Sequence, residues 1–452
     1  MDGSEPAERK RGELLMADYL TTDTELTSIA NAIRTKGGTS AALTYPAGFV
    51  SAIEAIPTGG VVVQESDVNF IDYDGTIVAS KTKAQINAMT ADTDLPENPT
   101  HAGLTSQGWN WTVAQLKAQL LAMPDQPVWV GQMYATVSGA TEIDVEMQKG
   151  RLSPIMVLSP KGTVSIDWGD NTTPDTLTGN SLYTQKDVSH TYASPGKYTI
   201  KISRTSGTYN IYCSATKTIL RKNTTANENQ VYSNAIKHVR VGSYCTVYNN
   251  AFYQCTSLET VTLPSDLPAL GANPFQNCYS LKSLTLPKSQ TFLETGLCTK
   301  CTSMRYMSIC GGMTTSYGSI FSSCQALRSI TIPCGLSKTG SYMFQYCYSI
   351  DKIYLPEGLT EIGNSSFQYC QSLANFTVPS TVTSILSAAF SHCEGLNEIH
   401  MLPTSPPTLE ASNIFNNEAT DFVIYVPRGK LNDYQTASVW SNYASKMQEE
   451  PA

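Results

Sequence analysis

Seven cysteines recur every 23 residues through the C-terminal half of the chain. They are Cys255, Cys278, Cys301, Cys324, Cys347, Cys370 and Cys393, called the cysteine ladder below. A fixed period of about 20 to 50 residues predicts a solenoid, because one short repeat cannot bury its apolar side chains and must stack on its neighbours. Solenoids present long surfaces that usually bind a partner, so the spacing also constrains the function.

The residues around each cysteine predict how one coil is built. Three positions before the cysteine an aromatic recurs, at Phe252, Phe275, Phe321, Phe344, Phe367 and Phe390. Three positions after it a Leu or Ile recurs, at Leu258, Leu281, Leu327, Ile350, Leu373 and Leu396. A Leu-x-Leu-Pro tail then predicts a short strand that ends at the proline. The outward strand position holds Thr262, Thr285, Ser308, Thr331, Tyr354, Thr377 and His400, a row that is typical of an exposed sheet face.

The unit F-x-x-C-x-S-L-x-x-L-x-L-P resembles the BspA-type leucine-rich repeat over residues 235–427, and the resemblance implies a C-terminal solenoid. The third copy departs from the pattern, because Cys298 replaces the Phe while Met304 and Cys310 replace the Leu and the Pro. We expect a local irregularity there without a change of period. Residues 428–452 are expected to cap the open end. The apolar side chains that would cover the last coil are Leu431, Tyr434, Trp440 and Tyr443.

The first 58 residues form a separate region. Residues 1–15 are polar and contain Arg11-Gly-Glu, which a ribosome-binding sequence can encode, so we interpret them as a disordered or non-native leader before a natural start at Met16. Residues 16–58 predict two short helices, the first opened by the capping box Thr22-x-x-Glu25. The segment resembles the N-terminal attachment segment of phage and prophage tail proteins. That resemblance implies docking to phage tail or baseplate proteins, a place in the virion tail, and a homotrimer as in many tail fibres.

Residues 61–127 predict a small α/β spacer. An Asp74-Gly75 turn predicts a hairpin, and helices are expected to begin at Ser80 and Thr112. One face of the second helix would carry Val113, Leu116, Leu120 and Leu121. The pair Trp109 and Trp111 is interpreted as core, with a binding site as the alternative.

Residues 128–215 have β character and contain Trp168-Gly-Asp, His190-Thr-Tyr and Gly196-Lys-Tyr. These motifs resemble the PKD-type β-sandwich, which implies a second β module. Asp167, Asp170 and Asp175 could hold Ca²⁺, but one strand-turn region supplies all three. We therefore prefer a structural turn in which the carboxylates bond local backbone amides, and expect no metal.

Composition excludes several classes of function. The net charge is −8 without a basic stripe, so nucleic acid is not expected as a partner. No apolar stretch approaches the ~20 residues of a membrane-spanning helix. The twelve cysteines allow a disulfide framework, but the even spacing of the ladder favours buried thiols. Cys298 and Cys301 form a C-x-x-C without a second pair or a nearby His, so we expect no zinc and no other cofactor.

No catalytic motif is present, so an enzyme is not expected. His392 and His400 could approach each other near the end of the solenoid, but are interpreted as surface residues. An enzyme acting on glycans would need a pair of carboxylates that the sequence does not indicate. The sequence thus predicts a multidomain, mainly β protein with short N-terminal helices, a small α/β unit, a PKD-like sandwich and a leucine-rich-repeat solenoid.

The favoured function is a receptor-binding, tail-fibre-type protein of a phage or prophage, whose solenoid binds a glycan or protein on the bacterial surface. The alternative is a BspA-type surface adhesin that binds host proteins or glycans. Such an adhesin would carry a secretion signal and a wall anchor, and neither pattern is visible. The candidate ligand-binding residues are the tyrosines of adjacent coils, Tyr346, Tyr348, Tyr354 and Tyr369, together with Tyr279. The alternative is that these tyrosines only cover turns.

Overall fold

The structure is a computed structural model that describes residues 67–451, except 215–217, 223–229, 269 and 417–418. The chain divides into two units, residues 1–65 and 66–452. The predicted leader (1–15) and attachment segment (16–58) lie outside the described residues. The described residues all belong to the second unit.

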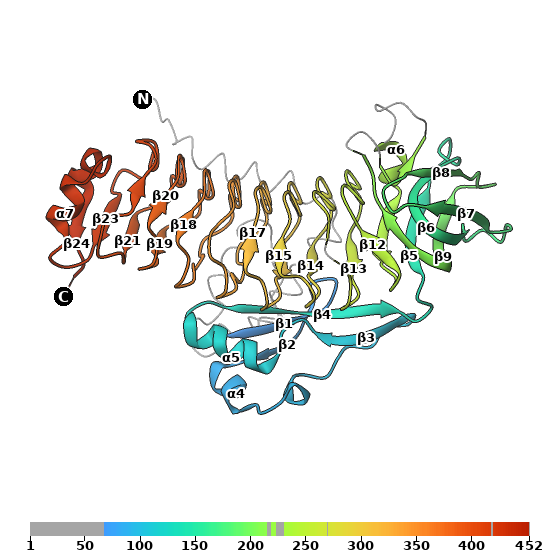
Figure 1. Cartoon of the computed structure of the whole chain (residues 1–452), viewed down its shortest axis with the longest axis horizontal. Helices are drawn as coiled ribbons and strands as arrows, with labels where there is room; N and C mark the ends of the chain where they lie inside the picture. The colour runs from blue at the N-terminus through green and yellow to red at the C-terminus, as the bar shows by residue number, and fades with distance from the viewer. Residues whose placement is uncertain (1–66, 215–217, 223–229, 269, 417–418, 452) are drawn as a thin grey trace, which may run out of the picture. The chain divides into compact units, whose positions relative to one another are not determined.

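The C-terminal half is a β-solenoid, and the predicted fold class, mainly β with few helices, is confirmed (Figure 1). Most coils contribute to a first series of parallel strands: β11 (Ile236–Arg240), β13 (Thr260–Thr262), β14 (Ser283–Thr285), β16 (Tyr306–Ser308), β19 (Asn375–Val378), β21 (Glu398–Met401), β23 (Val423–Val426) and β24 (Met447–Glu449). The coils with Thr331 and Tyr354 have no assigned strand at this position. A second, shorter series contains β12 (Cys245–Val247), β15 (Phe292–Leu293), β17 (Thr315–Ser316), β18 (Glu361–Ile362), β20 (Ser384–Ile385) and β22 (Thr408–Leu409). A turn with the ladder cysteine then leads to the next coil.

The predicted columns form the core of the solenoid. Every Phe, Cys and Leu or Ile of the columns is fully buried. Neighbouring Phe rings stack, for example Phe344 on Phe367 with 5.6 Å between ring centroids. Six ladder thiols donate to the backbone carbonyl at the aromatic position of the preceding coil, over 3.0–3.3 Å, as Cys347 Sγ does to Phe321 O. Cysteine suits this position because it is small and apolar yet supplies the donor that a buried carbonyl needs.

The third coil keeps the period, since Ser283 of β14 pairs with Tyr306 of β16, 23 residues on. Its irregularity serves an intramolecular contact. Cys310 holds the position at which other copies have a proline, and Gly311 follows it. A Cβ added to Gly311 would lie 2.8 Å from the Trp111 ring. The indole Nε1 of Trp111 donates to Ile309 O at 2.8 Å. The departure from the repeat therefore makes room for a tryptophan from outside the solenoid.

The residues before the solenoid close its first coil. The β-rich segment contains β5 (Thr141–Met147), β6 (Ile155–Asp167), β7 (Asp175–Asn180), β8 (Lys186–Ser189), β9 (Gly196–Ile211) and β10 (Leu220–Arg221), followed by the one-turn helix α6 (Gln230–Ser233). The first part of β6, residues 155–158, pairs with β8 and β10. The remainder, residues 159–167, pairs with β7 and β9. Strand β5 pairs with β11, β9 pairs with β12, and one continuous core runs from Ile143 to Met447. This segment is therefore a cap on the solenoid.

A small domain of residues 68–136 contains β1 (Val68–Ile71), β2 (Ile77–Lys81), α4 (Lys83–Ala88), β3 (Leu104–Trp109), α5 (Val113–Ala122) and β4 (Val128–Thr136). Its sheet has the order β2-β1-β4-β3, and the Asp74-Gly75 hairpin joins β1 to β2. The sequence placed β4 in the following module, but its pairing with β1 and β3 puts it in this sheet.

Two further expectations for the small domain were wrong. Helix α4 begins at Lys83 with Thr82 as its N-cap, because Ser80 still pairs within β2. Leu121 is 82% exposed, outside the face that Val113, Leu116 and Leu120 bury. The start of α5 after Thr112 is confirmed, with a capping box closed by Gln115.

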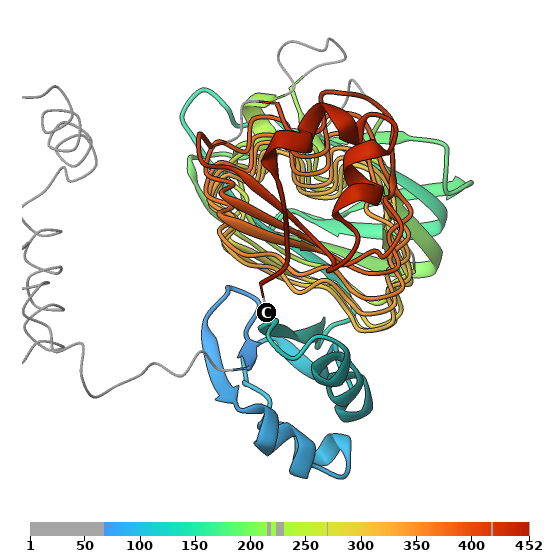
Figure 2. The same cartoon turned by 90° about the vertical axis from the view of Figure 1, so that its left-hand side faces the viewer.

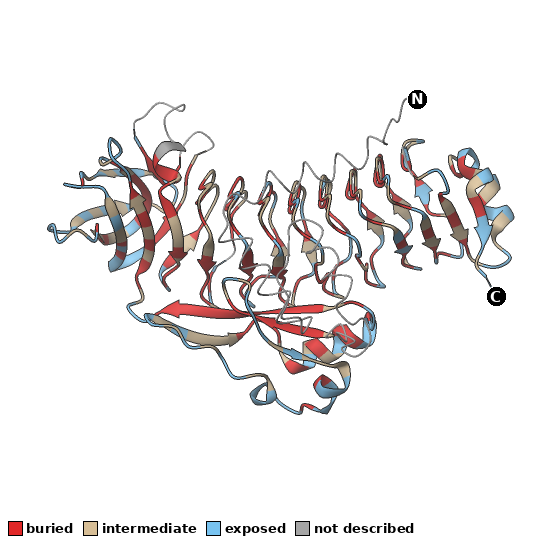
Figure 3. Cartoon of the chain, turned by 180° about the vertical axis from the view of Figure 1, so that it is seen from behind, coloured by how far each residue is buried: buried red, intermediate tan, exposed pale blue. Residues whose placement is uncertain are grey.

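The small domain packs along the first strand series (Figures 1 and 2). All nine residues of β4 are buried, as the red strand beneath the coils shows (Figure 3). Trp129 N donates to Thr331 Oγ1 at 2.8 Å, Thr331 Oγ1 donates to Pro127 O at 3.0 Å, and Ser308 Oγ donates to Trp129 O at 2.7 Å. The described residues of this domain thus pack against the solenoid and do not act as a simple spacer.

This packing corrects the expectation of an exposed threonine row. Thr262, Thr285, Ser308 and Thr331 are at most 7% exposed, whereas Thr377, in a later coil, is exposed. The pattern of one repeat indicates which side chains point outward, but another domain decides whether solvent reaches them.

The C-terminal residues cover the last coil. Helix α7 (Leu431–Thr436) and a 3₁₀ helix (Trp440–Lys446) bury Tyr434, Trp440 and Tyr443. Trp440 and Tyr443 contact Phe415, and Tyr434 packs edge-on against Trp440. The Trp440 indole donates to Pro407 O at 2.7 Å. Across the described residues no helix has the length and apolar character needed to cross a membrane.

Candidate functional site

The turn that carries each ladder cysteine has a fixed backbone form. The residue just before the cysteine has a φ between +60° and +64° in all seven copies: Gln254, Asn277, Lys300, Ser323, Tyr346, Tyr369 and His392. The N–H of this residue donates to a carbonyl of the next coil, as Tyr346 N does to Gln368 O at 2.9 Å. The left-handed form thus belongs to the hydrogen-bonded stacking of the coils.

In the last three copies this left-handed position is aromatic. Tyr346 stacks on Tyr369 with 4.7 Å between ring centroids, and Tyr369 stacks on His392 at 4.4 Å. Tyr348 meets Tyr346 edge-on at 6.2 Å. These four side chains, each partly exposed, are called the aromatic column below.

Stability alone does not account for the aromatic column. The left-handed form costs an L-residue roughly 1–2 kcal/mol, and Asn, present as Asn277 in the second copy, tolerates it better. A stacked aromatic pair contributes about 0.5–1.5 kcal/mol, so stacking only offsets the backbone cost. An exposed aromatic surface held at this cost is suited to binding, because Tyr offers flat apolar area, a hydroxyl and few rotatable bonds.

Polar side chains border the column. Gln345 Nε2 donates to Gln368 Oε1 at 2.6 Å, and Gln371 Nε2 donates to Glu394 Oε2 at 3.2 Å. Partial burial, with the neighbouring Tyr346 and Tyr369, raises the pKa of Tyr348 above its usual value. The surface combines aromatic faces with amide and hydroxyl groups, which suits a glycan or a polar protein segment.

The structure does not bring all five candidate tyrosines together. Tyr279, 43% exposed, holds the same turn position as Tyr348 three coils earlier, about 14 Å away at ~4.8 Å per coil. Tyr354 holds the strand position that Thr331 occupies one coil earlier, and no ring contact within the described residues joins it to the column.

The sequence missed His392 as a member of the site, although its place just before Cys393 matches Tyr346 and Tyr369. The two histidines near the end of the solenoid belong to separate groups. His392 stacks on Tyr369, whereas His400 stacks on Tyr425 and its Nδ1 lies 2.8 Å from Glu450 Oε1.

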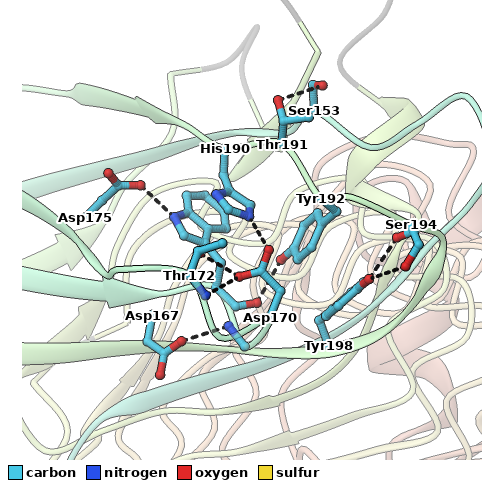
Figure 4. Close-up of polar contacts among 12 residues, drawn as sticks. Ser153, Asp167, Asp170, Thr172, Asp175, His190, Thr191, Tyr192, Ser194 and Tyr198 are labelled. Carbon is cyan, nitrogen blue, oxygen red and sulfur yellow. Dashed lines mark hydrogen bonds and ion pairs between the residues drawn. The ribbon is translucent and has the colours of Figure 1, made fainter.

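The Trp168-Gly-Asp turn is a hydrogen-bonded corner (Figure 4). Asp167 accepts from Gly169 N, Asp170 accepts from Thr172 and lies 2.8 Å from His190 Nε2, and Asp175 accepts from the Trp168 indole. The Trp168 and His190 rings stack at 4.7 Å. Each carboxylate has a local partner, as expected for the structural turn.

The other candidate ligand sets are core. Cys298 and Cys301 are fully buried, and burial raises the pKa of Cys298 well above its usual value. Nowhere in the described part of the chain do three or more His, Cys, Asp or Glu side chains form a group that could hold a metal ion. Trp109 and Trp111 are buried, as the core interpretation predicted.

The comparisons with known proteins concern the repeat region. Residues 224–348 and 301–420 match the family described as BspA type leucine rich repeat region, in six copies, so the class of this solenoid is a BspA-type leucine-rich-repeat solenoid. No curated protein matches the chain.

Several solved structures are similar. A leucine-rich repeat protein of T. pallidum is 23% identical over 42% of this chain and 84% of its own, with a TM-score of 0.31. A leucine-rich repeat protein of Bacteroides ovatus is 22% identical over 45% of this chain and 63% of its own, with a TM-score of 0.29. A leucine rich cell surface protein of Faecalibacterium prausnitzii is 19% identical over 52% of this chain and 95% of its own, with a TM-score of 0.21.

Proposed function

We propose that this chain is a non-enzymatic, adhesin-type surface protein that binds a protein or glycan on a cell surface through the aromatic column. The observation that carries the proposal is the stacked series Tyr346, Tyr369 and His392, placed at a backbone position that Asn holds at lower cost. The match to BspA-type repeats supports a binding protein of this class.

The test replaces the rings without disturbing the turn. Tyr346→Asn combined with Tyr369→Asn removes two faces of the aromatic column, while Asn accepts the left-handed backbone. We expect unchanged or slightly higher stability and at least tenfold weaker binding of the purified protein to bacterial or epithelial cells, which corresponds to about 1.4 kcal/mol.

The matched control is Tyr183→Ser, which removes a 64% exposed tyrosine from the segment that caps the solenoid. This variant should bind as the parent does. Equal binding by the folded double variant and the parent would exclude the aromatic column as the site.

A second candidate function is a receptor-binding protein of a phage or prophage tail, acting in the virion on a bacterial glycan or protein. Its support is the resemblance of residues 16–58 to tail attachment segments, with a homotrimer as the expected assembly. Deleting residues 16–58 should then abolish incorporation into tail particles while the solenoid stays folded. Incorporation of the truncated protein would rule the tail assignment out.

The resemblance of the β-rich segment to a PKD-type module rests on its Trp-Gly-Asp and His-x-Tyr sequence motifs alone. We propose that in this chain its role is to cap the solenoid, as the β5 to β11 pairing supports.

A further inference from the structure

A groove crosses the outward face of the sheet where β5 and β11 join. Its largest hollow, about 510 Å³, lies between a small-domain edge with Asp74 and His101 and a wall of Arg240 and Thr262. A second hollow of about 430 Å³ shares residues His238 and Glu259 with the first, and a third of about 120 Å³ shares Glu146 and Lys237 with the second. The three together are called the junction groove below.

The junction groove collects charge in a chain with few charges. Charged residues make up 15% of the sequence. The groove is lined by the acidic residues Asp74, Glu142, Asp144, Glu146 and Glu259. It is equally lined by the basic residues Arg151, Lys197, Lys237, Arg240 and Lys282. The balance of five against five favours an uncharged ligand, since a polyanion such as nucleic acid needs an excess of Lys and Arg.

The charges are held in place before any ligand arrives. Both Nη atoms of Arg240 donate to Asp144, each over 2.8 Å, and its Nε donates to Glu142 Oε2 at 3.0 Å. Lys282 Nζ donates to Glu259 Oε2 at 3.0 Å. A ligand that binds such fixed donors and acceptors avoids most of the entropy cost of ordering side chains.

One hydroxyl of the lining has no hydrogen-bond partner among the described residues. Thr262 is 4% exposed, and its Oγ1 is buried and unpaired. At the same strand position two and three coils on, Ser308 and Thr331 find partners in the backbone of Trp129. A buried polar group without a partner costs about 1–3 kcal/mol of stability. Thr262 therefore lies where the cover by β4 ends, and a ligand that hydrogen-bonds its hydroxyl would remove this cost.

We propose that the junction groove binds a neutral oligosaccharide. Sugar hydroxyls donate to carboxylates and accept from Arg and Lys, so a neutral polyhydroxyl chain satisfies both halves of the lining without net charge. A peptide would need deep apolar pockets for anchoring side chains, and the lining is mainly polar. The site lies on the first coils and is independent of the aromatic column.

The experiment is calorimetric titration of the full chain with neutral linear tetrasaccharides of glucose, mannose and N-acetylglucosamine. A sulfated tetrasaccharide and an acidic nonapeptide are the comparison probes. We expect at least one neutral tetrasaccharide to bind, and to bind tenfold or more weakly to Glu259→Gln and to Lys282→Met. The control Asp351→Asn, at an exposed position outside the groove, should bind as the parent does.

Thr262→Val separates binding from folding. The change removes a hydroxyl that has no partner, so the unfolding midpoint should stay or rise while saccharide affinity falls. Absence of binding by every neutral probe, or binding of the sulfated probe or the peptide alone, would overturn the proposal.

The two proposed sites give different patterns. Saccharide binding that groove variants leave intact and the double Tyr→Asn variant abolishes would refute the junction groove and support the aromatic column. Saccharide binding that the groove variants lose and the double Tyr→Asn variant keeps would support the junction groove and show that the aromatic column does not bind the saccharide.

Discussion

The outward strand position behaves differently in two parts of the same solenoid. In the covered coils, which contain Thr285, Ser308 and Thr331, this position is buried under β4. In the open coils, which contain Thr377 and His400, it is partly or fully exposed. The repeat supplies similar side chains in both parts, so the difference arises from the neighbouring domain.

The covered coils also differ in how closely another backbone approaches. A Cβ added to Gly131 of β4 would lie 2.0 Å from Thr285 Oγ1, and Gly311 leaves room for Trp111. The open coils instead carry large partly exposed side chains, such as His400 stacked on Tyr425. Small residues thus mark the part of the solenoid that receives the small domain.

Substitutions in the inward columns should lower stability equally in the covered and the open coils. Phe321→Ala in a covered coil and Phe390→Ala in an open coil each empty a fully buried site, so each should lower the free energy of unfolding by roughly 3–5 kcal/mol. Urea unfolding followed by circular dichroism measures both. A loss confined to one of the two would show that the columns are not equivalent.

The outward position should show the contrast directly. Thr331→Val leaves Trp129 N and Pro127 O without their partner and should cost about 1–3 kcal/mol. Thr377→Val removes an exposed hydroxyl and should change stability by only about 0.5 kcal/mol. Equal effects in the same urea titrations would contradict the packing of β4 on the solenoid.

Acid should distinguish the charged junction from the neutral covered coils. Burial raises the pKa of Asp144, but hydrogen bonds from Arg240 and Thr199 outweigh burial and lower this pKa below its usual value. The stabilisation from this pair is therefore present above pH ~4, the unfolded pKa, and is lost as the pH falls through the lower folded pKa. The deficit of Asp144→Asn should shrink between pH 6 and pH 2.

The matched comparison is Thr331→Val, whose deficit should stay the same from pH 6 to pH 2, because its hydrogen bonds join uncharged groups. Urea midpoints at the two pH values give both answers. A constant deficit for Asp144→Asn would mean that the ion pair does not stabilise the junction.

Thiol reactivity should be the smallest effect, because it leaves stability unchanged. Of the twelve cysteines only Cys334 is not buried, and burial raises the pKa of Cys347 and Cys393 to about 12. Brief iodoacetamide treatment at pH 8 should therefore modify Cys334 alone in the native protein. Twelve adducts should form after denaturation, counted by intact mass, and two missing adducts per pair would reveal disulfides in either part of the solenoid.

The sequence predicted the solenoid well because its inward positions obey a local rule. Phe344, Cys347 and Ile350 must be apolar in every coil, whichever domain lies outside. The aromatic column was found in part, since Tyr346, Tyr348 and Tyr369 come together, whereas Tyr354 points to another face of the same coil. His392 was overlooked because its role depends on stacking across coils.

The 23-residue period by itself determined the coil, the buried columns and the class of the solenoid, because a short repeat buries its apolar side chains by stacking on its neighbours. Tertiary structure alone decided that β4 covers part of the threonine row, that β5 and β9 close the first coil, and that opposite charges meet at their junction. Many of these contacts join residues far apart in the chain, such as Glu142 and Arg240, 98 positions apart, and Asn110 and Ser308, 198 positions apart. The repeat pattern does not indicate these contacts, because each contact occurs once and joins surfaces that meet only after the chain has folded.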